Sequence, residues 1–544
     1  MTPETLAGRT PFAPAGDHGL IIGGEEIATG EGFDAIDPSV GRPWARLPQA
    51  TEDDVDAAVR AAAKAFASWR RTTPAQRQRI LWEMADRVEA DPDRWARLLA
   101  TENGRPIREA YVADVPTCAG ILRYFSGLCR DLRGDHVPLE DPGSVAFTTR
   151  EPLGVIAALI PWNSPIITLA NKIGPALAAG NTLVIKPSEY ASVSVLEFVR
   201  LVEDLVPPGV LNVVCGFGPS VGAALVAHPG VAKITFTGGS ETARRIMAAA
   251  GGALTPSMME LGGKGAMVVC ADADLDLAVA DALTGIFMAN GEVCVAASRL
   301  LVHESVHEEF GERFAAVAEG IVVGDALDPE TQFGPLVSAD HRARVQSCID
   351  AAVAQGARVR TGGGVPRLDA PLDGGFFLAP TLLEDPGGAT SASSEEIFGP
   401  VTVLERFSDD DAAVERANEG PYGLAAGVWT RDLARGQVEP LVHPHDPGLQ
   451  RACHPVRAGQ VPRPHAGRQA VGTLVRAHRM ARSLEAGIVW VNKWFDLPAG
   501  LPMGGIGDSG FGRELSPETL HEYSAPKAIN IGLGDARPRL WGAG

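Results

Sequence analysis

The chain has 544 residues, more than one hydrophobic core usually supports, so two or three domains are expected. Its formal net charge of −19 argues against nucleic acid and anionic membranes as partners. Seven cysteines, without a Cys-x-x-Cys pair or a Cys/His metal spacing, predict free thiols, no metal site and a reducing, cytoplasmic location.

The N-terminal part is expected to begin with a loose extension at residues 1–18, which lacks the pattern of a secretory signal. The run Leu20–Gly24 predicts a short strand and a turn. Thr51 is predicted to cap a helix that has Asp54 in its first turn, and Pro74 is predicted to open a second helix. No apolar stretch is long enough to span a bilayer, so no membrane partner is expected.

From Val155 to Val269, short apolar runs alternate with helical stretches. The predicted strands are 155–160, 182–185, 210–214 and 234–236, and the predicted helices begin near Pro165, Val193, Ser220 and Glu241. Strands buried on both faces and joined by helices indicate a parallel α/β sheet. The same alternation resumes after Leu277 and continues through 489–491, which predicts a second α/β domain.

Residues 436–476 interrupt this pattern, because they contain five arginines and four histidines but only two acidic residues. They show neither helical nor strand periodicity, and their removal would restore a helix across the gap. We interpret them as an irregular surface insertion or a sequence artefact. The alternative is a histidine-rich metal site that includes His443 and His445.

Two residues have the chemistry of a catalytic pair. Cys294 follows small residues and a glycine, which leaves its backbone approachable, and Glu260 enters a Gly-Gly turn that lets it move. A thiol supplies a nucleophile and a carboxylate supplies a base. The alternative for each residue alone is a buried, inert cysteine and a solvated surface glutamate.

A phosphate-binding turn is predicted at Phe236-Thr237-Gly238-Gly239-Ser240, because this run ends a strand and opens a helix. A second glycine-rich run, Gly216–Gly222, is close to a dinucleotide fingerprint but has the wrong spacing.

The stretches Phe287–Cys294 and Glu260–Lys264 resemble the two active-site signatures of the aldehyde dehydrogenase superfamily. Other family-like motifs follow in the family's order: Pro161-Trp162-Asn163, Lys186-Pro187-Ser188-Glu189, Phe236–Ser240, Glu395–Pro400 and the Gly504–Gly512 loop. The resemblance runs from about Leu20 to Leu533 with one interruption. It implies two Rossmann-like, doubly wound parallel-sheet domains plus a small β oligomerisation arm.

The resemblance also implies a division of the chain. An NAD-binding domain is expected at residues 19–127 and 151–262, a catalytic domain at 263–514, and a bridging arm at 128–150 and 515–544.

The resemblance further implies the catalytic roles. Cys294 would attack the aldehyde, Asn163 would stabilise the oxyanion, and Glu260 would activate water to hydrolyse the thioester. Lys172 would lie near the proton path, with Glu514 as a second carboxylate near the site. A glutamate at position 260 points to the hydrolytic, non-CoA-acylating branch of the family.

The implied binding residues fall into two groups. Those for the cofactor are Ile160, Pro161, Trp162, Lys186, Glu189, Gly222, Phe236, Thr237, Gly238, Gly239, Ser240, Leu261, Glu396 and Phe398. Those for the substrate are Ser164, Asn171, Val293, Trp494, Leu497 and Met503. A carboxylate at Glu189 favours NAD over NADP, because it would repel a 2′-phosphate. Small polar residues at Ser164 and Asn171, where the family often has aromatic ones, predict a wider and more polar pocket.

We therefore expect an NAD-dependent aldehyde dehydrogenase, a homodimer or homotetramer, that acts on a bulkier or polar-substituted aldehyde. A catalytically impaired or non-enzymatic binding protein on the same fold is the first alternative, because the segment 436–476 interrupts the catalytic domain. A reductive enzyme that acts on an acyl phosphate with NADPH is the second, and Glu260 and Glu189 weigh against it.

Overall fold

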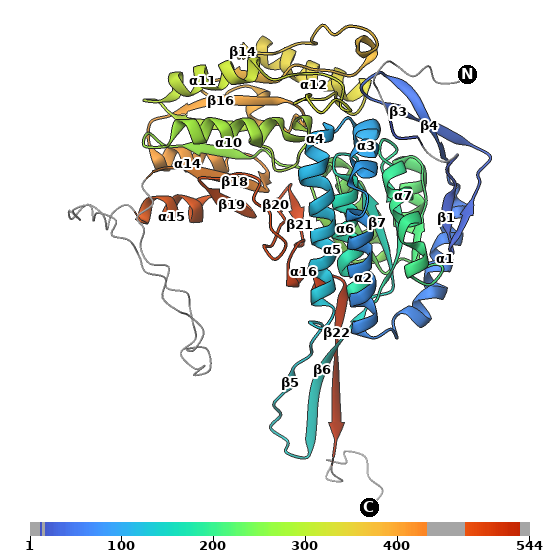
Figure 1. Ribbon diagram of the computed structural model, residues 1–544. Coiled ribbons are helices and arrows are strands. Elements are labelled where there is room, and N and C mark those ends of the chain that lie inside the picture. Colours follow the sequence, from blue (N-terminus) through green and yellow to red (C-terminus); the bar gives the residue numbers. More distant parts are fainter. Residues whose placement is uncertain (1–10, 14–16, 432–473, 534–544) are drawn as a thin grey trace, which may run out of the picture.

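The computed structural model of the protein describes residues 11–13, 17–431 and 474–533, which form two α/β bodies and a projecting β arm (Figure 1). The predicted fold class is confirmed. Most of the segment 436–476 lies outside the described residues, including His443 and His445, and only its last three residues fall within them.

The first body contains an eight-stranded sheet whose five central strands are parallel. Its strand order is β2 (Glu25–Ile27), β1 (Leu20–Ile22), β9 (Leu211–Val213), β8 (Thr182–Pro187), β7 (Val155–Ile160), β10 (Lys233–Thr237), β11 (Ser257–Glu260) and β21 (Gly510–Phe511). Every residue of β7 is buried, as the uninterrupted apolar run predicts for a strand covered on both faces.

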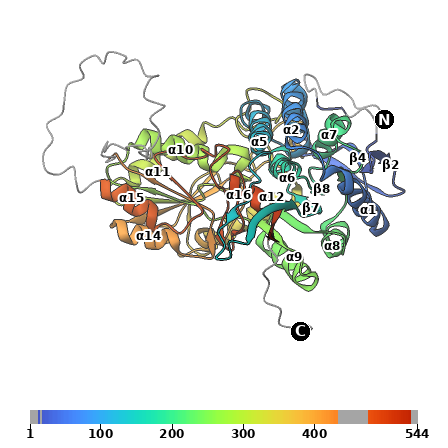
Figure 2. The same cartoon turned by 90° about the horizontal axis from the view of Figure 1, so that it is seen from below.

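Helices cover both faces of this sheet (Figure 2). One face carries α6 (Pro165–Ala179) and α7 (Val193–Val202), with α2 (Pro74–Glu89) and α5 (Val115–Leu128) outside them; the other carries α1 (Glu52–Trp69), α8 (Ala223–Ala227) and α9 (Ser240–Ala253). The predicted helix starts are confirmed, because Thr51 and Asp54 cap each other at α1 and Pro74 is the first residue of α2.

The second body contains a seven-stranded sheet that is parallel except for its edge strand β14. Its order is β14 (Arg358–Thr361), β15 (Thr381–Glu384), β16 (Val401–Phe407), β13 (Arg299–His303), β12 (Ala266–Val269), β18 (Ala425–Trp429) and β19 (Ile488–Val491). Helices α10 (Leu275–Phe287), α11 (His307–Glu319), α12 (Ala339–Ala354), α14 (Asp410–Asn418) and α15 (Leu474–Ser483) pack around it.

Helix α15 includes the end of the segment predicted to be irregular. Arg476 lies within it and forms an ion pair with Asp410, and Met480 is fully buried against the sheet. The last three residues of the predicted insertion, from Leu474 to Arg476, are therefore helical.

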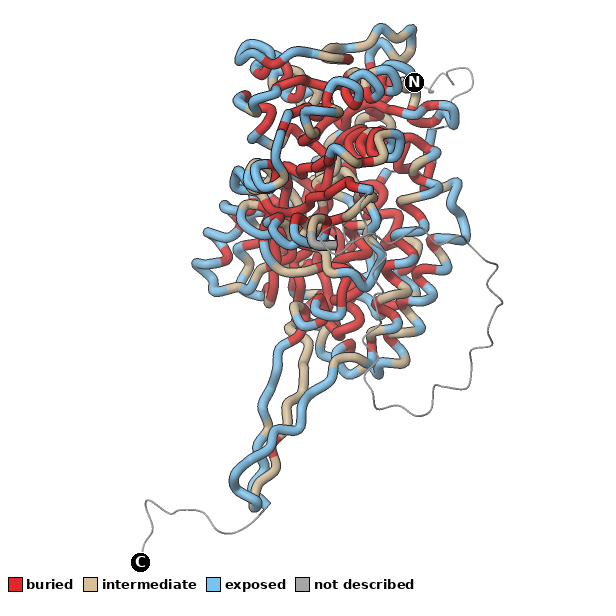
Figure 3. The backbone as a smooth tube through the Cα atoms, turned by 90° about the vertical axis from the view of Figure 1, so that its left-hand side faces the viewer, coloured by how far each residue is buried: buried red, intermediate tan, exposed pale blue. Residues whose placement is uncertain are grey.

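The arm is a three-stranded antiparallel sheet in the order β22 (Ser524–Gly532), β6 (Ser144–Pro152) and β5 (His136–Val137). Strands β22 and β6 pair over nine residues, from Ser524 with Pro152 to Gly532 with Ser144. Figure 3 shows the arm as a largely exposed extension of a buried core. Its exposed apolar side chains include Val137, Leu139 and Ile531.

Two further findings concern the described residues only. All six of the cysteines among them are free thiols. No helix within these ranges combines the length and the apolar character needed to cross a membrane.

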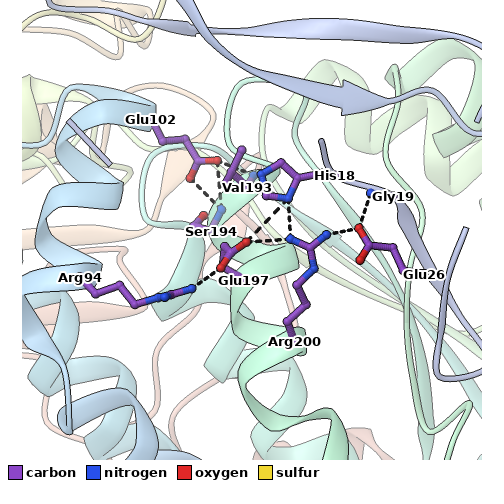
Figure 4. Close-up of polar contacts among 9 residues, drawn as sticks. All are labelled: His18, Gly19, Glu26, Arg94, Glu102, Val193, Ser194, Glu197 and Arg200. Atoms are coloured by element: carbon purple, nitrogen blue, oxygen red, sulfur yellow. Dashed lines mark hydrogen bonds and ion pairs between the residues drawn. The ribbon is translucent and has the colours of Figure 1, made fainter. Parts of the chain in front are cut away.

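A polar network fastens the N-terminal segment to the first body (Figure 4). Arg200 on α7 donates to His18 Nδ1 at 2.8 Å and to Glu197 at 2.8 Å, and it also pairs with Glu26 on β2. Glu197 pairs in turn with Arg94 on α3 (Pro92–Asn103). Because the guanidinium of Arg200 can only donate, Nδ1 of His18 accepts this hydrogen bond and carries no proton.

We predict that the stability of the fold depends on pH through His18. Burial, and then the positive charge of Arg200, lower the pKa of His18 below its usual 6.5. The unfolded chain therefore takes up a proton more readily than the folded one, and stability falls as the pH drops below about 6.5. The change His18→Gln should reduce the loss of thermal stability between pH 7.5 and 5.5, measured by calorimetry. The exposed His521→Gln is the control, and equal pH profiles for both variants would contradict the prediction.

Candidate active site

A cavity of about 640 Å³ lies where strands of the first sheet end and the second body begins. Trp162 and Asn163 follow β7, Thr237 and Gly238 are at the end of β10, and Glu260 is the last residue of β11. The carboxyl ends of parallel strands share one edge of a sheet, which is where such folds place ligands. Residues far apart in the sequence therefore meet here, because the strands that carry them end at the same edge of the sheet.

The second body contributes Cys294 through a tight turn. Ala289, Asn290 and Gly291 all have left-handed backbone, with φ of 54°, 58° and 76°. A Cβ on Gly291 would lie 2.4 Å from the carbonyl carbon of Gly399, so only glycine fits there. The buried Asn290 side chain fixes the turn, because it donates to the carbonyls of Gly104 and Pro335 at 2.9 Å and accepts from Gly334 N at 2.8 Å.

The thiol of Cys294 is protonated near neutral pH. Burial, followed by the carboxylates of Glu396 and Glu260, raises its pKa to about 12. The surroundings of Cys294 in this structure therefore favour the neutral thiol over the thiolate. A base or a change of surroundings must remove the proton before sulfur can attack.

Glu260 is a buried carboxyl group, and neither of its oxygens has a hydrogen-bond partner among the described residues. Burial, and then the negative charge of Glu514, raise its pKa well above the usual value, while Lys172 opposes the rise. Lys172 Nζ is 2.5 Å from Glu514 Oε1, and both side chains are buried. The structure thus brings together the predicted base, the predicted lysine and the second carboxylate.

Asn163 lies opposite the cysteine turn, because its Nδ2 donates to the carbonyl of Glu292 at 2.8 Å. Its own backbone carbonyl accepts from Arg105 Nη2 at 2.6 Å. Asn103, two residues before Arg105, donates to the carbonyl of Trp162 at 2.9 Å. Sequence reasoning missed Asn103 and Arg105, since nothing in the sequence indicates that the end of α3 reaches this loop.

The glycine-rich turn before α9 faces the cavity with Thr237, Gly238 and Gly239. Gly239 is the N-cap of this 14-residue helix, and a Cβ built on it would meet open space. Backbone N–H groups at a helix start, with room beside them, suit a phosphate group. The hydroxyl of Ser240 is already used, because it donates to the carbonyl of Asp508 at 2.8 Å.

The predicted cofactor residues do not all reach the cavity. Pro161, Trp162, Thr237, Gly238, Gly239, Leu261, Glu396 and Phe398 line it, whereas Ile160, Lys186, Glu189, Gly222, Phe236 and Ser240 lie outside its lining. Lys186 is buried at the end of β8, where burial lowers its pKa, and its Nζ is 3.6 Å from Glu189 Oε2. This pair could serve only a ligand that extends past the cavity.

Three rings form one wall of the cavity. Trp162 contacts His341 and Phe398 edge-on, with ring centroids 5.2 and 5.4 Å away. His341 Nε2 donates to the carbonyl of Phe398 at 2.8 Å, and burial lowers the pKa of His341 to about 4, so the ring is neutral. Phe398 has a φ of 55°, and this hydrogen bond helps to hold that strained residue.

Glu396 is held against the Gly262-Gly263 turn by close backbone contacts, and its charge acts on Cys294. Its Oε1 accepts from Gly263 N at 2.8 Å, and a Cβ on Gly262 would lie 2.0 Å from Oε2. Burial raises the pKa of Glu396 to about 6.

Of the predicted substrate residues, Ser164, Asn171, Val293, Leu497 and Met503 line the cavity. Trp494 does not. Its indole N–H donates to the carbonyl of Val295 at 2.9 Å, and its ring stacks on Trp429 inside the second body. The adjacent Phe495, with a φ of 61°, lines the cavity instead.

A family model described as "Aldehyde dehydrogenase family" matches residues 26–438 and 469–529 of the chain. Residues 439–468 between the two matched parts lie within the predicted insertion.

Similar proteins include (Z)-2-((N-methylformamido)methylene)-5-hydroxybutyrolactone dehydrogenase of Acinetobacter baylyi, which is 39% identical over 95% of this chain and 97% of its own length. A crystal structure of a putative aldehyde dehydrogenase from Burkholderia cenocepacia is 38% identical, with a TM-score of 0.87 over 96% of this chain and 99% of that one. The structure of PnpE from Pseudomonas sp. WBC-3 with nicotinamide adenine dinucleotide is 38% identical, with a TM-score of 0.86 over 96% and 99% of the two chains.

We predict slow alkylation of Cys294 in the unliganded protein. With a pKa of about 12, the thiolate fraction, and hence the rate with iodoacetamide, should rise about tenfold per pH unit between pH 7 and 9. Peptide mass mapping separates this cysteine from Cys348, and Cys294→Ser is the control. A rate independent of pH above 7 would contradict the raised pKa.

Proposed function

The chain belongs to the aldehyde dehydrogenase family, and from that premise we propose that it oxidises an aldehyde to a carboxylic acid with NAD and water. The observation that supports this most is the meeting of Cys294, Glu260 and Asn163 on one cavity that also reaches the turn before α9. Nucleophile, base, oxyanion donor and phosphate-binding turn are the parts that this reaction requires.

The residues fit NAD. Gly239 leaves open space at the start of α9, and the Thr237 hydroxyl, also on this turn, has no partner among the described side chains and backbone groups. Glu396 at the cavity, and Lys186 with Glu189 beyond it, are proposed to bind the two riboses. NAD, when bound, supplies the acceptor for the hydride of the substrate. PnpE, a similar structure, holds this cofactor.

The chain's own residues perform the remaining chemistry. Glu260 accepts the thiol proton, Cys294 Sγ bonds to the aldehyde carbon, and the amide of Asn163 donates to the oxygen of the thiohemiacetal. After oxidation, Cys294 is acylated, and Glu260 accepts a proton from the water that attacks the thioester. Glu260 can serve in both steps only when it is ionised, and its raised pKa then makes the carboxylate a stronger proton acceptor.

The buried pair of Lys172 and Glu514 is proposed to relay the proton away from Glu260. Both groups interact electrostatically with Glu260, so a charge on one changes the proton affinity of the others.

A bulkier or polar-substituted aldehyde is the proposed substrate. Ser164 and Asn171 line the cavity with small polar side chains. The Acinetobacter relative is named for a substituted hydroxybutyrolactone, which is larger and more polar than a simple aldehyde.

A homodimer or homotetramer is the proposed assembly, with the sheet of β5, β6 and β22 as the bridging arm. This sheet stands away from both bodies and exposes Val137, Leu139 and Ile531 (Figure 3). We also propose the domain division predicted from the sequence and a reducing, cytoplasmic location, which the free thiols suit.

The change Cys294→Ala is expected to lower NADH formation from an aldehyde panel by more than about 10³-fold, because no other cysteine among the described residues lines the cavity. The change Glu260→Gln should lower kcat by about 10²-fold, because deprotonation of the thiol and hydrolysis of the thioester both lose their base. Cys348→Ala is the matched control. Full activity of the Cys294 variant would refute the proposed function.

Deletion of residues 439–468 is expected to leave kcat/KM within about threefold, because long surface insertions are usually tolerated. The measurement is NADH formation by the deleted and complete chains. A complete chain that is inactive, beside an active deleted chain, would instead support the alternative of an impaired protein.

A further inference from the structure

The substrate end of the cavity has one polar wall, made by two packed helices. Asp114 and Thr117 lie at the start of α5, and Ser164, Thr168 and Asn171 lie on or just before α6. The spacing of three or four residues puts each set on one helix face, and α5 packs against α6. The other side of this end is apolar, with Val293, Phe495 and Leu497.

This wall contains two buried oxygen atoms that lack partners. Asp114 is 1% exposed and Asn171 is 6% exposed, and Oδ1 of each has no hydrogen-bond partner among the described residues. A buried acceptor without a donor is unfavourable, so such a group indicates that a donor comes from outside the chain. Because both residues line the cavity, a substrate can supply it.

Arg105, the guanidinium beside Asp114, is already committed to other groups. Arg105 Nε is 3.2 Å from Asp114 Oδ2, its Nη2 donates to Asn163 O and to Ser164 Oγ at 3.0 Å, and its Nη1 is 3.6 Å from Glu109. A substrate carboxylate here would be repelled by the negative charge of Asp114, and Arg105, which already pairs with Asp114, would not be free to bind it. The electrostatics of the wall therefore disfavour an anionic substituent.

We propose that this wall selects aldehydes whose far end carries a neutral hydrogen-bond donor, an amide N–H or a hydroxyl group, and rejects those that end in a carboxylate. The inference rests on the proposed oxidation at Cys294. Asp114 and Asn171 accept from the donor, and the apolar side holds the carbon chain between the donor and the aldehyde. Sites that hydrogen-bond a substrate group discriminate strongly against analogues that lack it, because their own polar atoms then stay unpaired.

The test uses the complete enzyme and three aldehydes. 6-Oxohexanamide and 6-oxohexanoate have the same shape but differ in donor and charge, and hexanal lacks a polar end. We expect kcat/KM for the amide to exceed that for the carboxylate by about tenfold or more, mainly through KM. Equal values for the two, or a preference for the carboxylate, would overturn the inference while leaving the proposed function intact.

The same assay separates the substrate preference from the proposed function. If none of the three aldehydes gives NADH, the proposed function itself is overturned. Two variants then test which residues of the wall set the substrate preference. Asp114→Asn should reduce the preference for amide over carboxylate, and Asn171→Leu should reduce the preference for amide over hexanal. Asp53→Asn, an exposed change on α1, is the matched control. Unchanged ratios in both cavity variants, with circular dichroism confirming that they fold, would overturn the assignment to this wall.

Discussion

Cys294 shares one poorly solvated cavity with the buried carboxyl groups of Glu260 and Glu396, and burial raises the pKa of all three. Each group is costly to charge there, so the site favours the neutral thiol until a proton acceptor is used. The positive charge of the buried Lys172, which pairs with Glu514, opposes the rise in the pKa of Glu260. The surroundings of Cys294 therefore favour the protonated form of its thiol.

Precise placement of the reactive atoms depends on buried polar side chains outside the reaction. Asn290 fixes the left-handed turn before Cys294 with three hydrogen bonds, and Arg105 and Asn103 hold the loop of Asn163. Asn290 belongs to the second body, and its hydrogen bond to Gly104 reaches the first body. One bond of Asn290 thus crosses from the second body to the first, whereas the bonds of Arg105 and Asn103 hold the loop of Asn163 within the first body.

The local sequence predicted much of this arrangement. Strand β7 was predicted by its uninterrupted apolar run, and the starts of α1 and α2 by Thr51 and Pro74, because such signals act between neighbouring residues. The motifs around Cys294 and Glu260 indicated a nucleophile and a base, and the structure places both on one cavity. The limits of the irregular segment were predicted less well, since composition changes gradually and helix α15 begins within it.

What the sequence alone determined is the class of fold and the family, and it supplied the candidates for the reactive side chains, since each depends on short patterns. Only the tertiary structure decided which of these residues meet. It turned Trp494 into the second body and Phe495 into the cavity, and it brought Asp114, with its partner Arg105, to the same cavity wall as Asn171. Burial, charge coupling and unpaired oxygens arise from contacts between segments far apart in the chain, and no local pattern encodes them.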